Sequence, residues 1–251
     1  MTSRGAALVT GAGRRIGRAL ALEAARAGFD VAVHYRTARD EAQAVADEIV
    51  ALGRRAVVLD AELTDEAQTA GLIARAAQAL GPVTLLVNSA STFEDDRLAT
   101  ATRESWDAHL DANLRAPIAL AQTFAAALSA EHQALIVNIV DQRVLRPNPQ
   151  FFSYSLSKAG LWWATQTMAQ ALAPAIRVNA IGPGPVLASV HQAPGEFERE
   201  AAATPLERAV SPDDIAAALR YLIDAGSVTG QMIAVDAGQH LGWRTPDIIG
   251  S

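Results

Sequence analysis

Residues 6–17 read AALVTGAGRRIG, an apolar run followed by a turn that holds three glycines. The run Ala6–Thr10 has the length and composition of a buried strand, and a helical pattern follows it. Gly11, Gly13 and Gly17 allow a tight turn, close approach of the backbone to a phosphate, and close packing of the helix. Because a helix N-terminus offers unpaired amides to an anion, the stretch predicts a dinucleotide-binding turn. An ordinary strand-to-helix turn is the alternative.

The same alternation of short apolar runs and longer helical patterns continues along the chain. The expected strands are Ala6–Thr10, Val31–His34, Ala56–Asp60, Thr84–Asn88, Leu135–Ile139, Ile176–Ile181 and Met232–Val235. The expected helices are 16–27, 40–52, 65–80, 103–130, 154–173 and 213–224. Such alternation predicts an α/β fold of the Rossmann-type doubly wound kind, with a seven-stranded parallel sheet and helices on both faces. No linker-like change in composition interrupts it, so we expect a single domain over residues 1–251.

The least regular segment spans residues 182–204, rich in Gly and Pro at first and then charged. It follows the sixth strand, beyond the carboxyl ends of the strands where a doubly wound fold binds ligands. We therefore expect a substrate-covering loop, with a plain surface excursion as the alternative. The first residues of the tail 239–251 are too apolar for the tail to be simply exposed to solvent. We therefore expect it to contact a neighbouring subunit.

The composition narrows the possible functions. Half of the residues are apolar, 19% are charged and the formal net charge is −6. This is typical of a well-packed globular protein and gives no basic footprint for nucleic acid or an anionic membrane. The absence of cysteine excludes disulfides and zinc–thiolate sites and fits a reducing, cytoplasmic location. The five histidines have no metal-ligand spacing, the start of the chain reads as a strand rather than a signal peptide, and no apolar segment could span a bilayer.

The end of the second strand indicates which nicotinamide cofactor is used. An NAD site usually places an acidic residue there to bind the ribose 2′-hydroxyl. This chain has Tyr35 and Arg36 instead. Arg15 and Arg36 could clamp a 2′-phosphate with charged, planar donors, which predicts NADP(H). Alternatively, both arginines are solvated charges at helix edges.

Residues at the ends of two further strands are expected to contact the same cofactor. Asp60, Glu62 and Leu63 follow the third strand, where a doubly wound fold passes near the adenine ring. The fourth strand ends in small residues that let the backbone approach a flat ligand, or that simply form a polar turn: Asn88, Ser89, Ala90 and Ser91.

Tyr154 and Lys158 form a candidate catalytic pair. They stand four residues apart at the start of a predicted helix, so both side chains project from one face. A phenol has a pKa of about 10, and a nearby ammonium lowers that pKa by stabilising the phenolate. Alone, this spacing occurs by chance in many helices, but together with the glycine-rich turn it favours a site.

These motifs together resemble the short-chain dehydrogenase/reductase family over nearly the whole chain. They are TGAGRRIG, the 88–91 segment, Asn113 in a long helix, YSLSK from Tyr154 to Lys158, and Pro183-Gly184 after RVNAIG. The resemblance implies hydride transfer from a nicotinamide cofactor, a homodimer or homotetramer, and no metal. It makes Tyr154 the proton donor and has Lys158 bind the nicotinamide ribose and lower the tyrosine pKa. Asn113 would support a proton relay through water, and Ile16, Tyr35, Pro183 and Gly184 join the cofactor contacts.

One departure from the family pattern concerns the substrate. Thirteen residues before Tyr154, most members carry a serine that holds the substrate carbonyl, whereas this chain has Asp141. A carboxylate cannot donate a hydrogen bond unless it is protonated. The chain thereby resembles the pteridine reductase branch, which has Asp, Tyr and Lys at these positions, an arginine at Arg15, a His-Tyr pair after the second strand, and Asn-x-Ala-Ser-x-Phe as in 88–93. The alternative for Asp141 is a residue that caps backbone amides at the start of a loop.

In that branch Phe93 would stack on a pterin ring, although a core or interface aromatic is the alternative. Arg15, Ser91 and Tyr154 would bind the substrate, a small molecule with a flat heterocycle. We therefore expect hydride transfer from NADPH to a C=N bond of a pterin or folate-like ring. The alternatives are a carbonyl or 3-oxoacyl reductase of the same family and a catalytically idle NADP-binding module.

Overall fold

The seven apolar runs form one parallel sheet in the computed structural model, which describes residues 4–188 and 192–243. The strand order is β3-β2-β1-β4-β5-β6-β7, and every neighbouring pair is parallel. The strands are β1 (Ala6–Val9), β2 (Asp30–Tyr35), β3 (Ala56–Asp60), β4 (Val83–Asn88), β5 (Ala134–Ile139), β6 (Ile176–Pro183) and β7 (Met232–Val235). The order reverses between β1 and β4, which is where a doubly wound sheet binds its ligand.

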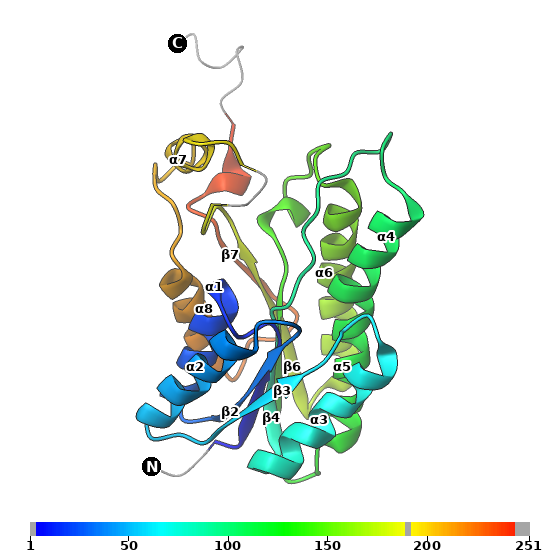
Figure 1. Ribbon diagram of the computed structural model, residues 1–251, viewed down its shortest axis with the longest axis vertical. Coiled ribbons are helices and arrows are strands. Elements are labelled where there is room, and N and C mark those ends of the chain that lie inside the picture. The colour runs from blue at the N-terminus through cyan, green and yellow to red at the C-terminus, as the bar shows by residue number, and fades with distance from the viewer. Residues whose placement is uncertain (1–3, 189–191, 244–251) are drawn as a thin grey trace.

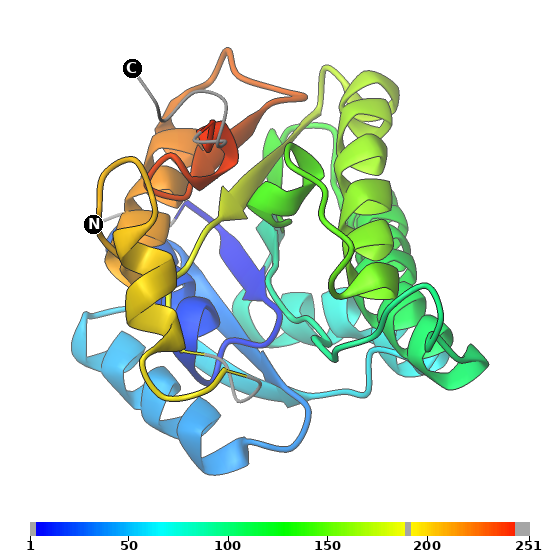
Figure 2. The ribbon, with the colours of Figure 1, turned by 90° about the horizontal axis from the view of Figure 1, so that it is seen from above.

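Helices cover both faces of the sheet (Figures 1 and 2). One face carries α1 (Arg15–Arg26), α2 (Arg39–Ala51) and α8 (Pro212–Asp224). The other face carries α3 (Glu66–Leu80), α5 (Ala116–Ala127) and α6 (Phe152–Leu172), with α4 (Arg103–Leu110) beside α6. Beyond the carboxyl ends of the strands lies α7 (Glu196–Ala202), next to the 3-10 helix η3 (Gln239–Leu241) (Figure 1). The predicted fold class is confirmed.

Strand β1 explains why the central strands are apolar throughout. Ala7 and Val9 pack into the core under α1, α2 and α8, whereas Ala6 and Leu8 pack into the core under α3, α5 and α6. All four side chains are fully buried. A strand with helices on both faces has no solvent side, so its sequence shows no polar alternation.

The predicted helix over 103–130 is interrupted and ends early. A π turn, η1 (Asp111–Arg115), joins α4 to α5, and α5 ends at Ala127. Pro117 has no N–H to donate to the carbonyl of Asn113, so the regular helical ladder cannot continue through this point. The wider turn buries the Asn113 side chain, which is only 1% exposed.

The segment 182–204 is more regular than predicted, because β6 extends to Pro183 and residues 196–202 form α7. Residues 189–191 of this segment and residues 244–251 of the tail lie outside the described part of the chain. The contact of the tail with a neighbouring subunit stays a prediction. Over the described residues, no helix combines the length and apolar character that a membrane span requires.

Candidate active site

The glycine-rich turn between β1 and α1 has no room for side chains. A Cβ on Gly11, whose φ is +64°, would lie 2.9 Å from the Cα of Ala90, and a Cβ on Gly17 would lie 2.1 Å from the carbonyl oxygen of Gly11. A Cβ on Gly13 would meet a milder constraint, 3.3 Å from the amide nitrogen of Ala42. The N-cap residue of α1 makes no side-chain hydrogen bond, so no capping group competes for the first amides of the helix. The turn therefore fits the phosphates of a dinucleotide.

Two polar residues that the sequence reasoning did not assign hold this turn in place. The Thr10 hydroxyl oxygen accepts hydrogen bonds from the N–H groups of residues 89 and 90 at 2.9 and 3.0 Å. The Gly11 N–H donates to His34 Nδ1 at 3.1 Å, and His34 Nε2 lies 3.2 Å from the carbonyl oxygen of Ala61. Because Nδ1 accepts, Nε2 must carry the proton. Burial lowers the pKa of His34 and keeps it neutral. The sequence did offer a signal for both residues, because each is a polar side chain at the carboxyl end of an apolar run.

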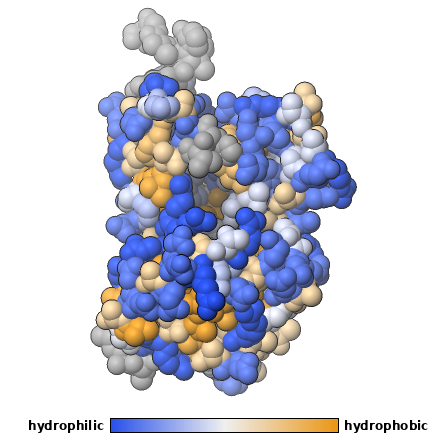
Figure 3. Space-filling view, viewed as in Figure 1, coloured by the Kyte–Doolittle hydropathy of each residue, from blue (hydrophilic) through white to orange (hydrophobic). Residues whose placement is uncertain are grey.

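A cleft of about 900 Å³ opens at the carboxyl ends of the strands. Figure 3 shows this face of the molecule hollowed between the side that carries α7 and the side that carries α4 and α6. Residues 185–187 of the segment 182–204 and residues of α7 line it, and the covering of a substrate by this segment stays a prediction. The predicted site residues that also line it are Arg15, Ile16, Ser89, Ser91, Phe93, Asp141, Tyr154, Lys158, Pro183 and Gly184.

The other predicted residues do not line this cleft. Six of them belong to the turn after β1, the end of β4 and the π turn: Gly11, Gly13, Gly17, Asn88, Ala90 and Asn113. Another four lie at the carboxyl ends of β2 and β3 or just after them: Tyr35, Arg36, Asp60 and Glu62. The Leu63 side chain packs in the core, 8% exposed, so the structure does not bring it to the predicted adenine contact.

Asp141 serves two partners, one with each carboxylate oxygen. Its Oδ1 accepts from the N–H of Arg143 at 2.8 Å and caps the 3-10 helix η2 (Gln142–Val144). Its Oδ2 accepts from the Tyr154 hydroxyl at 2.8 Å. The capping interpretation is therefore correct, and the same side chain fixes the direction of the phenol O–H. The catalytic role of Asp141 stays a prediction.

The charge environment of Tyr154 differs from the prediction. Burial, followed by the charge and hydrogen bond of Asp141, raises the pKa of Tyr154 well above its ordinary value. Lys158 is 2% exposed, donates from Nζ to the carbonyl of Ile139 at 2.8 Å, and lies 5.8 Å from the centre of the Tyr154 ring. Burial lowers the pKa of Lys158 to about 8. The prediction that Lys158 lowers the phenol pKa is thus wrong for this structure, because burial and the nearer carboxylate act in the opposite direction.

The π turn places Asn113 between the Phe93 loop and α6. Its Oδ1 accepts from the Thr92 N–H at 2.8 Å and from the Ser91 hydroxyl at 3.1 Å. Its Nδ2 donates to the Thr92 carbonyl at 2.9 Å and to the Ser157 hydroxyl at 3.1 Å. Both lone pairs and both N–H groups are therefore engaged within the protein. The side chain fastens the loop to the helix, and the water relay stays a prediction.

A second buried network fastens the start of α6 itself, and sequence reasoning missed it. Asp96 is 4% exposed and accepts from the Ser153 N–H at 3.0 Å, from the Ser153 hydroxyl and from the Ser105 hydroxyl. His109 Nδ1 lies 2.7 Å from the Ser153 hydroxyl oxygen, and its Nε2 accepts from the Glu94 N–H at 3.1 Å. Ser153 immediately precedes Tyr154, so this network positions the tyrosine. Its members are far apart in the sequence, which leaves no local signal.

Phe93 stacks on another aromatic ring in this structure. Its centroid lies 4.2 Å from that of Phe151 with an angle of 12° between the planes, and 4.7 Å from that of Tyr154, edge to face. Phe151 was not predicted. Phe93 is half-buried at the wall of the cleft, in keeping with either a ligand-stacking role or a packing role.

The structure gives the predicted cofactor arginines different partners. Arg15 donates to the carbonyls of Leu187 and Ala188, both at 3.2 Å, and so contacts the substrate loop. The Arg36 side chain is 64% exposed, and its Nη1 lies 3.8 Å from the carboxylate of Glu62. The two arginines therefore do not form a joint clamp in this structure.

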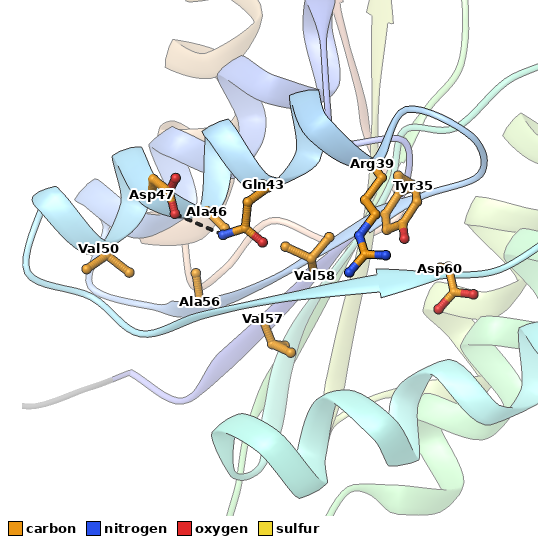
Figure 4. A pocket seen from close by; sticks show the side chains of 10 residues that line it. All are labelled: Tyr35, Arg39, Gln43, Ala46, Asp47, Val50, Ala56, Val57, Val58 and Asp60. Atoms are coloured by element: carbon orange, nitrogen blue, oxygen red, sulfur yellow. Dashed lines mark hydrogen bonds between the residues drawn. The ribbon is translucent and has the colours of Figure 1, made fainter.

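A smaller groove of about 480 Å³ lies between α2 and β3 (Figure 4). Tyr35 and Arg39, which precede and follow Arg36 in the sequence, are among the residues that line it. In this view Arg39, which the sequence reasoning missed, lies beside Tyr35. Asp60 also lines the groove, but its carboxylate accepts from Arg75 at 2.8 Å. Arg39 thus adds a second exposed cation to the region beyond β2, where a ribose phosphate would lie in this fold.

Among the described residues, no group of three or more His, Cys, Asp or Glu side chains is arranged to hold a metal ion. The strand order, the glycine-rich turn and the Tyr154–Lys158 pair define a dinucleotide-dependent oxidoreductase.

Known proteins are similar to this chain in architecture and in sequence. A family model described as enoyl-(acyl carrier protein) reductase matches residues 11–240. FolM alternative dihydrofolate reductase 1 from Brucella suis, solved in complex with NADP, is 47% identical, with a TM-score of 0.94 and coverage of 99% of this chain and 100% of that chain. The 3-oxoacyl-[acyl-carrier-protein] reductase FabG of Staphylococcus epidermidis is 32% identical over 240 residues, covering 94% of this chain and 98% of its own. The chain belongs to the short-chain dehydrogenase/reductase family.

Proposed function

We propose that this chain is an NADPH-dependent reductase that adds hydride to a C=N bond of a pterin or folate-like ring. The observation that carries the proposal is the 2.8 Å hydrogen bond from the Tyr154 hydroxyl to Asp141. A ketone reductase needs a second hydrogen-bond donor for the substrate oxygen, and an ionised carboxylate offers none. A ring nitrogen that gains a proton as hydride reaches the neighbouring carbon needs a positioned acid, which this pair can provide.

The residues of the cleft have distinct roles in that reaction. NADPH, when bound, supplies the hydride. Tyr154 delivers its hydroxyl proton to the ring nitrogen, and Asp141 orients that hydroxyl. Lys158 binds the nicotinamide ribose and places a positive charge behind the tyrosine. Phe93 and Ser91 hold the flat ring against the cofactor, while Arg15 contacts both ligands from the start of α1.

The cofactor preference rests on the end of β2. Arg36 and Arg39 are exposed there, and no acidic residue occupies the position that commonly binds a 2′-hydroxyl. Two exposed guanidinium groups suit a 2′-phosphate. The 47% identity to a protein whose crystal structure holds NADP supports this preference and the folate-like substrate alike.

A second candidate function is reduction of a 3-oxoacyl thioester. The 32% identity to FabG reductases over 94% of the chain favours it. In that reaction Tyr154 would donate to the carbonyl oxygen and Asp141 would only orient it. The ionised carboxylate of Asp141 stands where this reaction would use a neutral donor next to Tyr154, which makes 3-oxoacyl reduction the weaker candidate.

The test is a substrate panel under NADPH, read as loss of absorbance by the cofactor. The panel holds dihydropterins, dihydrofolate, 3-oxoacyl thioesters and simple ketones, each with wild type and Phe93→Ala. We expect higher kcat/KM for the flat heterocycles, and a loss of about tenfold for these in Phe93→Ala, since stacking adds on the order of 1 kcal/mol. A wild type that prefers thioesters or ketones would overturn the proposal.

The assembly and cellular location belong to the same proposal. Trp163 and Leu156 on α6 are 71% and 41% exposed, which supports a homodimer or homotetramer that covers this helix. The cytoplasmic location stays a prediction from the sequence.

A further inference from the structure

The short helix η2, which follows Asp141, leaves one buried donor of a half-buried cation without an acceptor. Arg143 stands in the middle of η2 and lines the cleft with Asp141 and Tyr154. Its Nη1 is buried and has no hydrogen-bond partner, and no ion pair joins it to another described residue. Gln142, next to it, likewise has a buried Oε1 without a partner. Buried polar groups are nearly always paired, so the open donor of Arg143 calls for an acceptor that a ligand could supply.

Aromatic rings hold the guanidinium of Arg143 in place. Its central carbon lies 4.8 Å from the centre of the Phe151 ring and 5.7 Å from the centre of the Phe93 ring. These cation–π contacts attract the charge but supply no oxygen acceptor to its N–H donors. The cation is therefore fixed beside the proposed ring-stacking residue, with its hydrogen-bonding capacity unused.

The acidic groups of the same cleft already have donors of their own. Asp95 pairs with Arg97, and Glu200 accepts from the side-chain amides of Gln192 and Gln239, both at 2.8 Å. Asp141 accepts from a backbone N–H and from Tyr154. Among the described residues that line the cleft, Arg143 is the one whose charged group is partly buried without an oxygen acceptor. The missing partner is thus an anion that arrives with the ligand.

We propose that Arg143 binds a carboxylate at the end of the substrate's tail, with Phe151 in contact with the aromatic ring of that tail. The inference rests on the proposed function and narrows its substrate class. Among pterins, the site should select a folate-like compound, whose ring carries an arylamide tail ending in carboxylates, over a pterin with a neutral side chain. A planar guanidinium is suited to this task because it can bind a carboxylate through two parallel hydrogen bonds.

The kinetic test compares dihydrofolate with dihydrobiopterin, whose side chain is neutral. We expect Arg143→Met to raise KM for dihydrofolate at least tenfold relative to KM for dihydrobiopterin. Any change in kcat that follows from losing a charge near Tyr154 should be shared by both substrates. Arg143→Lys should recover part of the loss. Arg146→Met is the matched control, because Arg146 lies three residues on, is exposed and does not line the cleft. Equal losses for both substrates in Arg143→Met, or no loss for either, would overturn the inference.

A binding measurement separates this inference from the proposed function. The probes are 4-aminobenzoyl-glutamate and its neutral diamide, in which both carboxylates are amides, titrated by calorimetry into the protein saturated with NADP⁺. We expect the carboxylate to bind more tightly to wild type and to lose that advantage in Arg143→Met. If no pterin is turned over but this difference holds, the proposed function fails and the anion site stands. If pterins are turned over and wild type binds both probes equally, the anion site fails and the proposed function stands.

Discussion

At the scale of single residues, opposing effects act on the pKa of Tyr154. Burial and Asp141 raise its pKa, whereas the positive charge of Arg143 lowers it. The phenol is therefore neutral in the structure described and holds its proton until a strong base forms beside it. A ring nitrogen that receives electrons during hydride arrival is such a base, and this makes Tyr154 a proton donor rather than a nucleophile.

Replacing Tyr154 with phenylalanine removes that proton and little else. We expect kcat to fall at least roughly a hundredfold, as general acids contribute about 10²–10⁴. The dissociation constant for NADPH should stay within threefold, because the hydroxyl bonds to Asp141 rather than to the glycine-rich turn. Steady-state kinetics and a cofactor titration check both values. Near wild-type turnover in this variant would remove Tyr154 from the mechanism.

Lys158 gives the protein a pH dependence with a definite sign. Burial lowers the pKa of Lys158 from 10.5 to about 8, so its side chain loses its positive charge as the pH rises through that value. If the ammonium binds the anionic cofactor, NADPH affinity should weaken between about pH 7 and about pH 9. Titrations across this range should show the decline in wild type but not in Lys158→Met. The same slope in both proteins would assign the decline to another group.

Arg36 should control the choice between NADPH and NADH. We expect a preference for NADPH of at least roughly tenfold, equivalent to about 1.4 kcal/mol. Because Arg36 is exposed and its contact with Glu62 is long, at 3.8 Å, it can turn to a phosphate at little cost. Arg36→Ala should narrow the preference by weakening NADPH alone, as kcat/KM for the two cofactors will reveal. A parallel loss with NADH would make Arg36 a structural residue.

The central residues of the site could be read from the sequence, whereas their surroundings could not. Asp141, Tyr154 and Lys158 follow from motif spacing, and the structure brings all three into one cleft. Phe151 and Arg143 escaped notice because their importance depends on mutual contact across the cleft. The direction of the Tyr154 pKa was wrong for the same reason, since burial is a property of the folded chain.

At the scale of elements, the junction of β1 and α1 should tolerate no added atom. A Cβ on Gly17 would lie 2.1 Å from the carbonyl oxygen of Gly11, which is backbone and cannot turn aside. We expect Gly17→Ala to destabilise the fold by about 1–3 kcal/mol, as overpacking does, and to weaken cofactor binding. Gly71→Ala in α3 is the control, because nothing lies within 4 Å of its Cβ position.

Denaturant unfolding of the two variants provides the comparison. Gly71→Ala should be neutral or more stable by up to about 1 kcal/mol, since alanine is the better helix former. Should Gly17→Ala match wild type in both stability and NADPH affinity, the close packing of the turn would have no role.

Element types followed from periodicity, but interruptions within elements did not. The seven strands were predictable because each is a short apolar run bounded by polar or small residues. The π turn at Asp111–Arg115 was not, although Pro117 gave a local reason to expect a break. The helix α7 was also missed, because its seven residues carry charges and small side chains without a clear apolar stripe.

At the scale of the whole molecule, one cleft collects groups from both halves of the doubly wound sheet. Arg15 and Ile16 come from the N-terminal half, whereas Asp141, Tyr154 and residues 185–187 come from the C-terminal half. The topology therefore brings a cofactor site and a substrate site to the same edge, and only the side chains at that edge decide which ring is reduced. The central claim is that this ring is a pterin.

A competition experiment tests that claim most directly. The protein is incubated with NADPH that carries deuterium at the transferred position and with equal concentrations of a dihydropterin and a 3-oxoacyl thioester. The deuterium in each product is then quantified by mass spectrometry. The label ratio at low conversion equals the ratio of kcat/KM for the two substrates. We predict at least a tenfold excess of deuterium in the tetrahydropterin, on the carbon of the former C=N bond. A majority of label in the 3-hydroxyacyl product would contradict the account.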